Sequence, residues 1–151
     1  QSDVVLVSAH WGNEGNNATQ KKYAQIFADA GVDVVLGTHP HVIQPVKWVK
    51  GSEGDRTLVA YSLGNFLNGQ STGNESNDLL GRIDFKISKK DKHQNQFLKS
   101  NFKVMMLDDY NDKDATHHGR NQMDSSSMSP AHLRDITRSV IDKQYIDNRS
   151  L

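Results

Sequence analysis

The sequence has no cysteine and only 3 prolines in 151 residues. The absence of cysteine excludes disulfide bonds, thiolate zinc sites and a cysteine nucleophile. Long hydrophobic runs are also missing, because no stretch approaches the ~18 consecutive apolar residues of a membrane-spanning helix. The chain begins with QSDVVLV, without a methionine and without a signal peptide. A buried type of strand at residue 3 is typical of the interior of a domain, so we expect a piece of a longer protein.

An excess of charge of one sign is lacking too. The 18 basic and 18 acidic residues give a formal net charge of zero. This balance does not favour nucleic acid as a partner, and the sequence has no dense run of Lys and Arg with interleaved aromatic residues. Hydrophobic residues make up 35% of the chain and mean hydropathy is -0.69. We therefore expect one domain in which a sizeable part of the chain lies in loops.

Two valine-rich runs, residues 3–10 and 32–37, predict strands that are buried on both faces, as in parallel sheets. Residues 19–31 between them predict a helix with one apolar face, formed by Tyr23, Ile26, Phe27 and Ala30. A strand, a helix and a strand within about 35 residues form a βαβ unit, whose two strands run parallel.

The remaining regular elements are predicted to be antiparallel strands and one terminal helix. Residues 41–50 and 57–66 favour two strands joined by a hairpin loop, and residues 79–88 and 97–107 favour a second antiparallel pair. A helix is expected from Pro130, with Leu133, Ile136, Val140 and Ile141 on its apolar side. The polar stretches 67–78 and 108–129 predict loops.

Three histidines follow the two parallel strands at their carboxyl ends. His10 ends the first strand, and His39 and His41 come directly after the second. Ligands of open α/β sheets gather outside the carboxyl ends of the strands, so we expect these side chains to lie together. Neutral imidazole is the commonest metal ligand, and two His around a Pro can bind two metals about 3.5–4 Å apart. The alternative is that they are ordinary hydrogen-bonded loop residues.

Three further side chains near these histidines are candidates with more than one interpretation. Glu14 is a metal ligand, a partner that fixes a histidine tautomer, or a solvated loop carboxylate. Asn65 in YSLGNF donates its amide to an anionic ligand, orients a histidine, or simply suits a turn. Trp11 stacks on a substrate or covers the helix.

Other catalytic patterns receive no support from the sequence. It contains no P-loop and no G-x-G-x-x-G. The one G-x-S-x-G match, residues 69–73, falls in a polar stretch that predicts a loop and not in a strand-to-helix elbow. The other histidines, His93, His117, His118 and His132, are expected to be solvated loop or surface residues.

Three motifs together resemble one protein family. VVLVSAHWGNE, AGVDVVLGTHPHVIQPV and YSLGNF, in this order and spacing, are similar to the bacterial capsule synthesis proteins of the CapA type, also called poly-γ-glutamate capsule proteins. The resemblance extends over residues 3–107. That family is similar in fold to the calcineurin-like metallophosphatases. The resemblance implies an α/β fold with mixed sheets, the C-terminal part of an α/β/β/α four-layer sandwich. Residues 1–107 would be the C-terminal half of that domain, and residues 108–151 its polar loop and last helix.

The resemblance also implies site residues. His10, His39 and His41 match metal-binding positions, and Mn, Fe or Zn is the expected metal. Glu14 as a further candidate ligand and Asn65 as a candidate catalytic residue come from their places in this sequence and not from the resemblance. The Asp-x-His, Gly-Asp and Gly-Asn-His-Asp motifs that supply carboxylate ligands in metallophosphatases would lie N-terminal to these histidines, and none of them precedes His10 in this sequence. Imidazoles alone do not offset the charge of two divalent cations, so we expect no tight dinuclear centre in this chain.

Two functions follow from the resemblance. One is a component of capsule or poly-γ-glutamate biosynthesis or export, which binds an anionic polymer (poly-γ-glutamate or capsule polysaccharide) or membrane synthase subunits. The other is a metal-dependent hydrolase of the phosphoesterase type that acts on a phosphoester. Both imply an extracellular or cell-envelope location. The absent half of the sandwich would leave apolar surface exposed, so we also expect a homo-oligomer or pairing with another chain.

Overall fold

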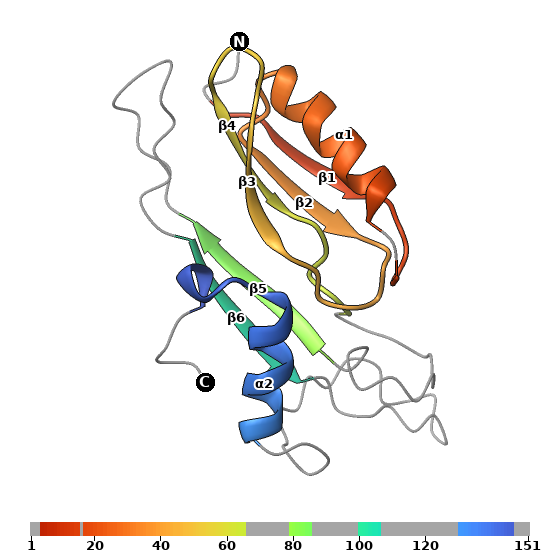
Figure 1. The fold of residues 1–151 in the computed structure, drawn as a ribbon, viewed down its shortest axis with the longest axis vertical. Coiled ribbons are helices and arrows are strands. Elements are labelled where there is room, and N and C mark those ends of the chain that lie inside the picture. Colours follow the sequence, from red (N-terminus) through yellow and green to blue (C-terminus); the bar gives the residue numbers. More distant parts are fainter. Residues whose placement is uncertain (1–3, 16, 66–78, 86–99, 107–129, 147–151) are drawn as a thin grey trace, which may run out of the picture.

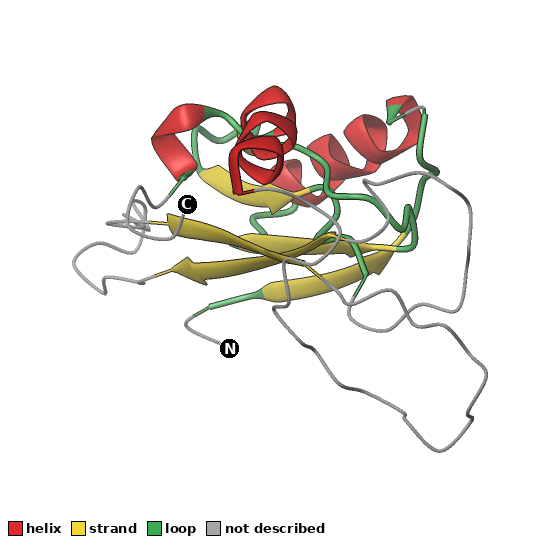
Figure 2. Ribbon diagram, turned by 90° about the horizontal axis from the view of Figure 1, so that it is seen from below, coloured by secondary structure: helices red, strands yellow, loops and turns green. Residues whose placement is uncertain are grey.

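The computed structural model describes residues 4–15, 17–65, 79–85, 100–106 and 130–146. These residues form a mixed α/β fold, which confirms the expected class (Figure 2). In chain order the elements are β1 (Leu6–His10), α1 (Ala18–Asp29), β2 (Val34–Thr38), β3 (Val46–Lys50), β4 (Arg56–Ala60), β5 (Leu79–Phe85), β6 (Ser100–Met106), α2 (Pro130–Val140) and the 3₁₀ helix η2 (Lys143–Tyr145).

The first four strands form one sheet in the order β1-β2-β4-β3 (Figure 1). β1 and β4 each pair with β2 in parallel, whereas β3 and β4 form an antiparallel hairpin. The predicted βαβ unit and the predicted mixed sheet are therefore confirmed. β5 and β6 pair antiparallel as a separate two-stranded sheet, as predicted for residues 79–88 and 97–107.

Alternate residues of the central strands point to two different cores, as the pleat of a strand requires. Val35 and Val59 belong to the core on the side of α1. Val34 and Leu58 belong to the core on the other side, against which Ile83 of β5 and the C-terminal helical segment pack. Figure 1 shows α1 on one side of the four-stranded sheet and β5, β6 and α2 on the other.

The predicted apolar face of α1 is largely wrong. Tyr23 and Ile26 are exposed, and the buried side chains are instead Gln20, Ala24 and Ala28. The small alanines let the helix approach the β3–β4 hairpin closely: a Cβ on Gly51 in the hairpin turn would meet the backbone of Ala28. Large apolar side chains on this face would hold the helix away from the sheet. The spacing of Tyr23 and Ile26 in the sequence therefore predicted the wrong side of the helix as buried.

The prediction that the first strand is buried on both faces is also wrong. β1 lies at one edge of the four-stranded sheet, and within the described residues it pairs with β2 alone. Leu6 is 49% exposed and Val5, just before the strand, is 40% exposed. Only Ala9 of the strand is buried, on the side of α1. This exposed apolar edge agrees with the expected self-association, which stays a prediction.

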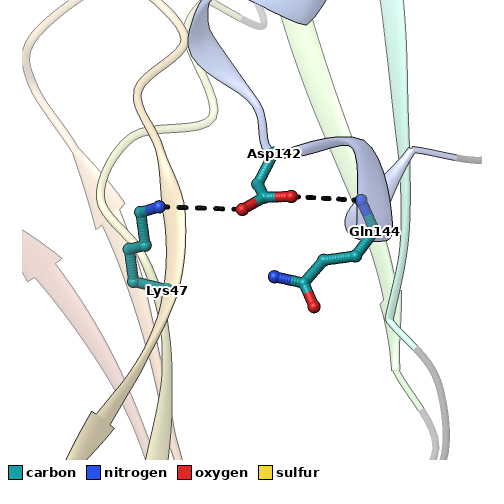
Figure 3. Close-up of polar contacts among 3 residues, drawn as sticks. All are labelled: Lys47, Asp142 and Gln144. Carbon is teal, nitrogen blue, oxygen red and sulfur yellow. Dashed lines mark hydrogen bonds and ion pairs between the residues drawn. The ribbon is translucent and has the colours of Figure 1, made fainter.

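The C-terminal helical segment packs on the sheet through its apolar side, as predicted for three of its residues. Ile141 is buried in the core, and Ile136 and Val140 pack against it. A polar contact lies beside this packing: Asp142 is 4.0 Å from Lys47 of β3 and accepts a hydrogen bond of 3.2 Å from the backbone of Gln144 (Figure 3). An exposed ion pair of this length contributes little stability, so the apolar contacts hold the segment in place.

Several predicted features lie outside the described residues. These are the loops at 67–78 and 108–129, and the histidines His93, His117 and His118. In the part of the chain that the structure does describe, no helix is long and apolar enough to cross a membrane.

Candidate functional site

The carboxyl ends of β1, β2 and β4 meet at one edge of the sheet. His10, the last residue of β1, lies opposite Thr38, the last residue of β2. The backbone N–H of Trp11 donates to the Thr38 carbonyl at 3.1 Å, and that of Leu63 donates to the Gly37 carbonyl at 3.3 Å. The segments that follow the three strands are therefore joined by backbone hydrogen bonds.

The structure brings the three predicted histidines together at this edge, which we call the histidine edge (His10, His39 and His41). The ring centroids of His10 and His39 are 4.4 Å apart, and those of His39 and His41 are 5.8 Å apart. His10 and His39 are exposed, and His41 is half-buried. The parallel pairing of β1 and β2 accounts for this arrangement, because it places the two strand ends side by side.

The backbone of the His-Pro-His turn is strained. His39 has φ of 94° and His41 has φ of 62°, a region that non-glycine residues seldom adopt. Pro40 between them is buried. Strained residues of this kind persist only where the surrounding structure holds them, and they cluster at ligand sites.

Asn65 contacts one of the histidines directly. Its side-chain oxygen Oδ1 lies 2.8 Å from Nδ1 of His41, and Asn65 is only 4% exposed. Because an amide oxygen accepts hydrogen bonds, the proton of neutral His41 is placed on Nδ1 and the lone pair on Nε2. This geometry favours the interpretation that Asn65 orients a histidine. The positive φ expected in this turn falls on Gly64, with φ of 75°.

Replacing Asn65 with leucine is expected to release His41 from this tautomer. Asn65→Leu leaves Nδ1 without its acceptor, so both neutral tautomers become populated. Asn65→Asp, which retains an acceptor of the same size, is expected to keep the proton on Nδ1. Long-range ¹H–¹⁵N spectra of the imidazoles distinguish the two forms. If His41 has the same tautomer in the wild type and in Asn65→Leu, the contact does not control it.

Glu14 stays a candidate ligand by sequence alone. Its side chain is exposed in the loop after β1. Among the described residues, no group of three or more His, Asp or Glu side chains is arranged to hold a metal ion. Imidazoles suit Zn, Fe and related ions, but the described donor set contains no carboxylate beside them. It therefore fits only part of a metal site.

Trp11 covers the helix rather than facing a ligand. Its indole ring is buried, 6.1 Å from the ring of Phe27 on α1 and 6.0 Å from that of Tyr61. Its Nε1 donates a hydrogen bond of 2.9 Å to the Tyr61 carbonyl. Gly37 makes this possible, because a Cβ at that position would lie 2.5 Å from Nε1 of Trp11 and would overlap the carbonyl oxygen of Tyr61. Burial also raises the pKa of the Tyr61 phenol, which therefore stays neutral near pH 7.

Two buried glutamines were not identified from the sequence. Gln20 of α1 donates from Nε2 to Oε1 of Gln44 at 2.7 Å and to the carbonyl of Tyr61 at 3.0 Å. Gln44 in turn donates from Nε2 to the carbonyl of Asn13 at 3.0 Å. No periodicity marks an amide that is buried by tertiary contacts, and the only local signal is that Gln44 follows the His-Pro-His turn closely.

Comparison with known proteins agrees with the motifs. Residues 1–70 match the family described as bacterial capsule synthesis protein PGA_cap, a shorter range than the 3–107 expected. The chain is 41% identical over 69 residues to the PGA biosynthesis protein CapA of Bacillus subtilis (strain 168). The aligned region covers 44% of this chain and 17% of that protein. It is 39% identical over 69 residues to the capsule biosynthesis protein CapA of Bacillus anthracis, covering 44% of this chain and 16% of the relative.

The match thus spans less than a fifth of the length of these curated relatives. The family match over residues 1–70 includes the whole histidine edge, Asn65 and both buried glutamines. Residues 1–70, a little under half of the chain, are thus similar to the bacterial capsule synthesis protein family PGA_cap.

Proposed function

We propose that this protein acts in the biosynthesis of a capsule or of poly-γ-glutamate, and that the histidine edge is its ligand-binding site. The names of its relatives support the process, since one is a PGA biosynthesis protein and the other a capsule biosynthesis protein. The site rests on one observation: His10 and His39 lie with ring centroids 4.4 Å apart, beside a strained turn. In α/β proteins, ligands bind at the carboxyl ends of the strands, and strained residues cluster at such sites.

The ligand chemistry that suits the edge is a divalent cation together with an anion. Exposed imidazoles bind ions such as Zn²⁺ or Fe²⁺, and Mn²⁺ also belongs to the expected set. The described donor set is incomplete, so carboxylates from elsewhere would have to supply the remaining ligands. The anion is a carboxylate-rich polymer such as poly-γ-glutamate, a capsule polysaccharide, or a phosphoester. Because the net charge is zero, a bound cation and not the protein's overall field would attract that anion.

The metallophosphatase-like four-layer sandwich and the cell-envelope location belong to the same proposal. The described four-stranded sheet, with β5, β6 and α2 on the side away from α1, is compatible with the sandwich. The relatives' part in capsule biosynthesis supports the location. The second candidate, a metal-dependent phosphoesterase, is supported by the tautomer of His41, because it leaves the lone pair of Nε2 available to a metal ion.

Retention of the protein on immobilised poly-γ-glutamate tests the proposed function. We expect the wild-type chain to be retained in the presence of Zn²⁺ or Mn²⁺ and released by EDTA. The variant with His39→Ala and His41→Ala is expected to pass through unretained. The proposed site would be overturned if EDTA does not release the wild-type protein, or if the double variant is retained as well. Hydrolysis of a phosphodiester by the metal-loaded wild type, lost in the double variant, would identify the site as that of the hydrolase.

A further inference from the structure

The two buried glutamines link the segments that carry the histidine edge. Gln20 is fully buried and Gln44 nearly so. Gln20 uses both hydrogens of its amide, one to Gln44 and one to the Tyr61 carbonyl, and Gln44 donates to the Asn13 carbonyl. The Tyr61 carbonyl also accepts from Nε1 of Trp11. Because Trp11 and Asn13 are two residues apart, these hydrogen bonds form a closed ring.

Apart from Gln20, the members of this ring lie close in sequence to a residue of the site. Trp11 follows His10, and Gln44 comes three residues after His41. Tyr61 begins the segment that reaches Asn65, and the backbone of Gln44 donates to the carbonyl of Ser62 in that segment at 3.0 Å. The ring thus joins the segments after β1, β2 and β4, while its other member, Gln20, comes from α1.

The ring is a costly way to fill a core. Oε1 of Gln20 is buried and has no hydrogen-bond partner within the described residues. A buried acceptor without a partner destabilises a protein, whereas an apolar side chain of similar shape carries no such cost. Packing alone therefore does not account for an amide at this position, but the need for directed hydrogen bonds does.

We propose that Gln20 and Gln44 are positioning residues of the histidine edge. Their amides hold the segment after His10 at a fixed distance from the His-Pro-His turn, and so keep the rings of His10 and His39 in contact. Neither glutamine touches the ligand. The inference rests on the proposed function only in treating the histidine edge as a binding site.

The test measures ring contact in the metal-free protein. Wild-type protein is expected to show a nuclear Overhauser effect between the ring protons of His10 and His39, whose centroids are 4.4 Å apart. In Gln44→Leu, the carbonyl of Asn13 and one hydrogen of Gln20 lose their partners, and we expect this effect to be lost. Gln20→Leu is expected to have the same result.

A matched control separates positioning from general destabilisation. Thr57 is also buried and donates from Oγ1 to the Val32 carbonyl, but at the opposite end of β4. Thr57→Val removes one buried hydrogen bond in the same sheet, and is expected to lower stability while keeping the effect between His10 and His39. If Gln44→Leu keeps the effect too, the glutamines do not position the edge.

Two further outcomes are decisive. If Gln44→Leu does not fold, Gln44→Glu tests the same link, because its carboxylate accepts from Gln20 and has no hydrogen to donate to Asn13. Loss of the ring contact in that variant supports the inference, and its retention overturns it. A wild-type protein that shows the contact but binds no divalent ion refutes the proposed function and leaves the positioning role intact. Absence of the contact in the wild type overturns the positioning role.

Discussion

Gly37→Ala is expected to lower the free energy of unfolding by about 3 kcal/mol, the upper end of the range for overpacking a core. The added Cβ would overlap the carbonyl oxygen of Tyr61 and would lie 2.5 Å from Nε1 of Trp11. Neither neighbour moves freely: the first is backbone of the segment after β4, and the second is a buried indole held by its hydrogen bond. Relief of the clash requires β2 to separate from β4 or Trp11 to leave the core, and both changes disturb the histidine edge.

Gly15→Ala is the matched control for this substitution. Gly15 lies in the loop after β1, and a Cβ there would meet nothing within 4 Å. Its effect should stay within about 0.5 kcal/mol, as for ordinary surface substitutions. Urea unfolding followed by tryptophan fluorescence compares the variants, and Trp11 reports directly on the affected contact. If Gly37→Ala is as stable as Gly15→Ala, the close approach of Trp11 to β2 is not present in solution.

Replacing both histidines of the turn is expected to weaken the binding of Zn²⁺ by about 100-fold or more. Loss of a residue that only supports a ligand typically costs 10–100-fold in metal affinity, and loss of the ligands themselves costs at least as much. His39 and His41 are two of the three imidazoles at the edge, so His39→Ala with His41→Ala leaves His10 as its only member. Isothermal titration calorimetry of Zn²⁺ at neutral pH measures the change.

The adjacent pair His117 and His118 supplies the control for that experiment. Replacing both with alanine removes the same number of imidazoles from the chain but none from the histidine edge. The affinity for Zn²⁺ should then remain close to that of the wild type. Equal weakening by the two double variants would show that Zn²⁺ binds to histidines in general and not to the edge.

The arrangement of the site could be predicted from the sequence because topology determines it. Two valine-rich runs separated by a helix specify parallel strands, and parallel strands place His10 and the His-Pro-His turn at the same edge. The hairpin formed by β3 and β4 followed from two strand-like runs separated by a short loop with turn residues. These inferences need only local patterns and the handedness of the chain.

The buried hydrogen bonds behind the histidine edge could not be predicted in the same way. The Trp11–Tyr61 and Gln20–Gln44 hydrogen bonds join residues 50 and 24 positions apart. No local pattern distinguishes a glutamine that will be buried from one on the surface. On α1, the spacing of Tyr23 and Ile26 suggested a buried face, but close packing on the sheet requires the smaller alanines instead.

The exposure of β1 has a similar explanation. A run such as VVLV predicts burial whether a strand lies in the centre of a sheet or at its edge, because apolar composition does not report which neighbours are present. In the structure, β1 pairs on one side only within the described residues, and Leu6 remains half exposed.

A titration of the metal-free protein with Zn²⁺, followed through the imidazole nitrogens of all 7 histidines, tests the proposed site most directly. We expect Nε2 of His41 to shift together with the ring nitrogens of His10 and His39, while the other four histidines stay unchanged. Nδ1 of His41 should remain protonated throughout, because Asn65 accepts its hydrogen bond. Uniform shifts of all the histidines, or shifts that leave these three unaffected, would contradict a ligand site at the histidine edge.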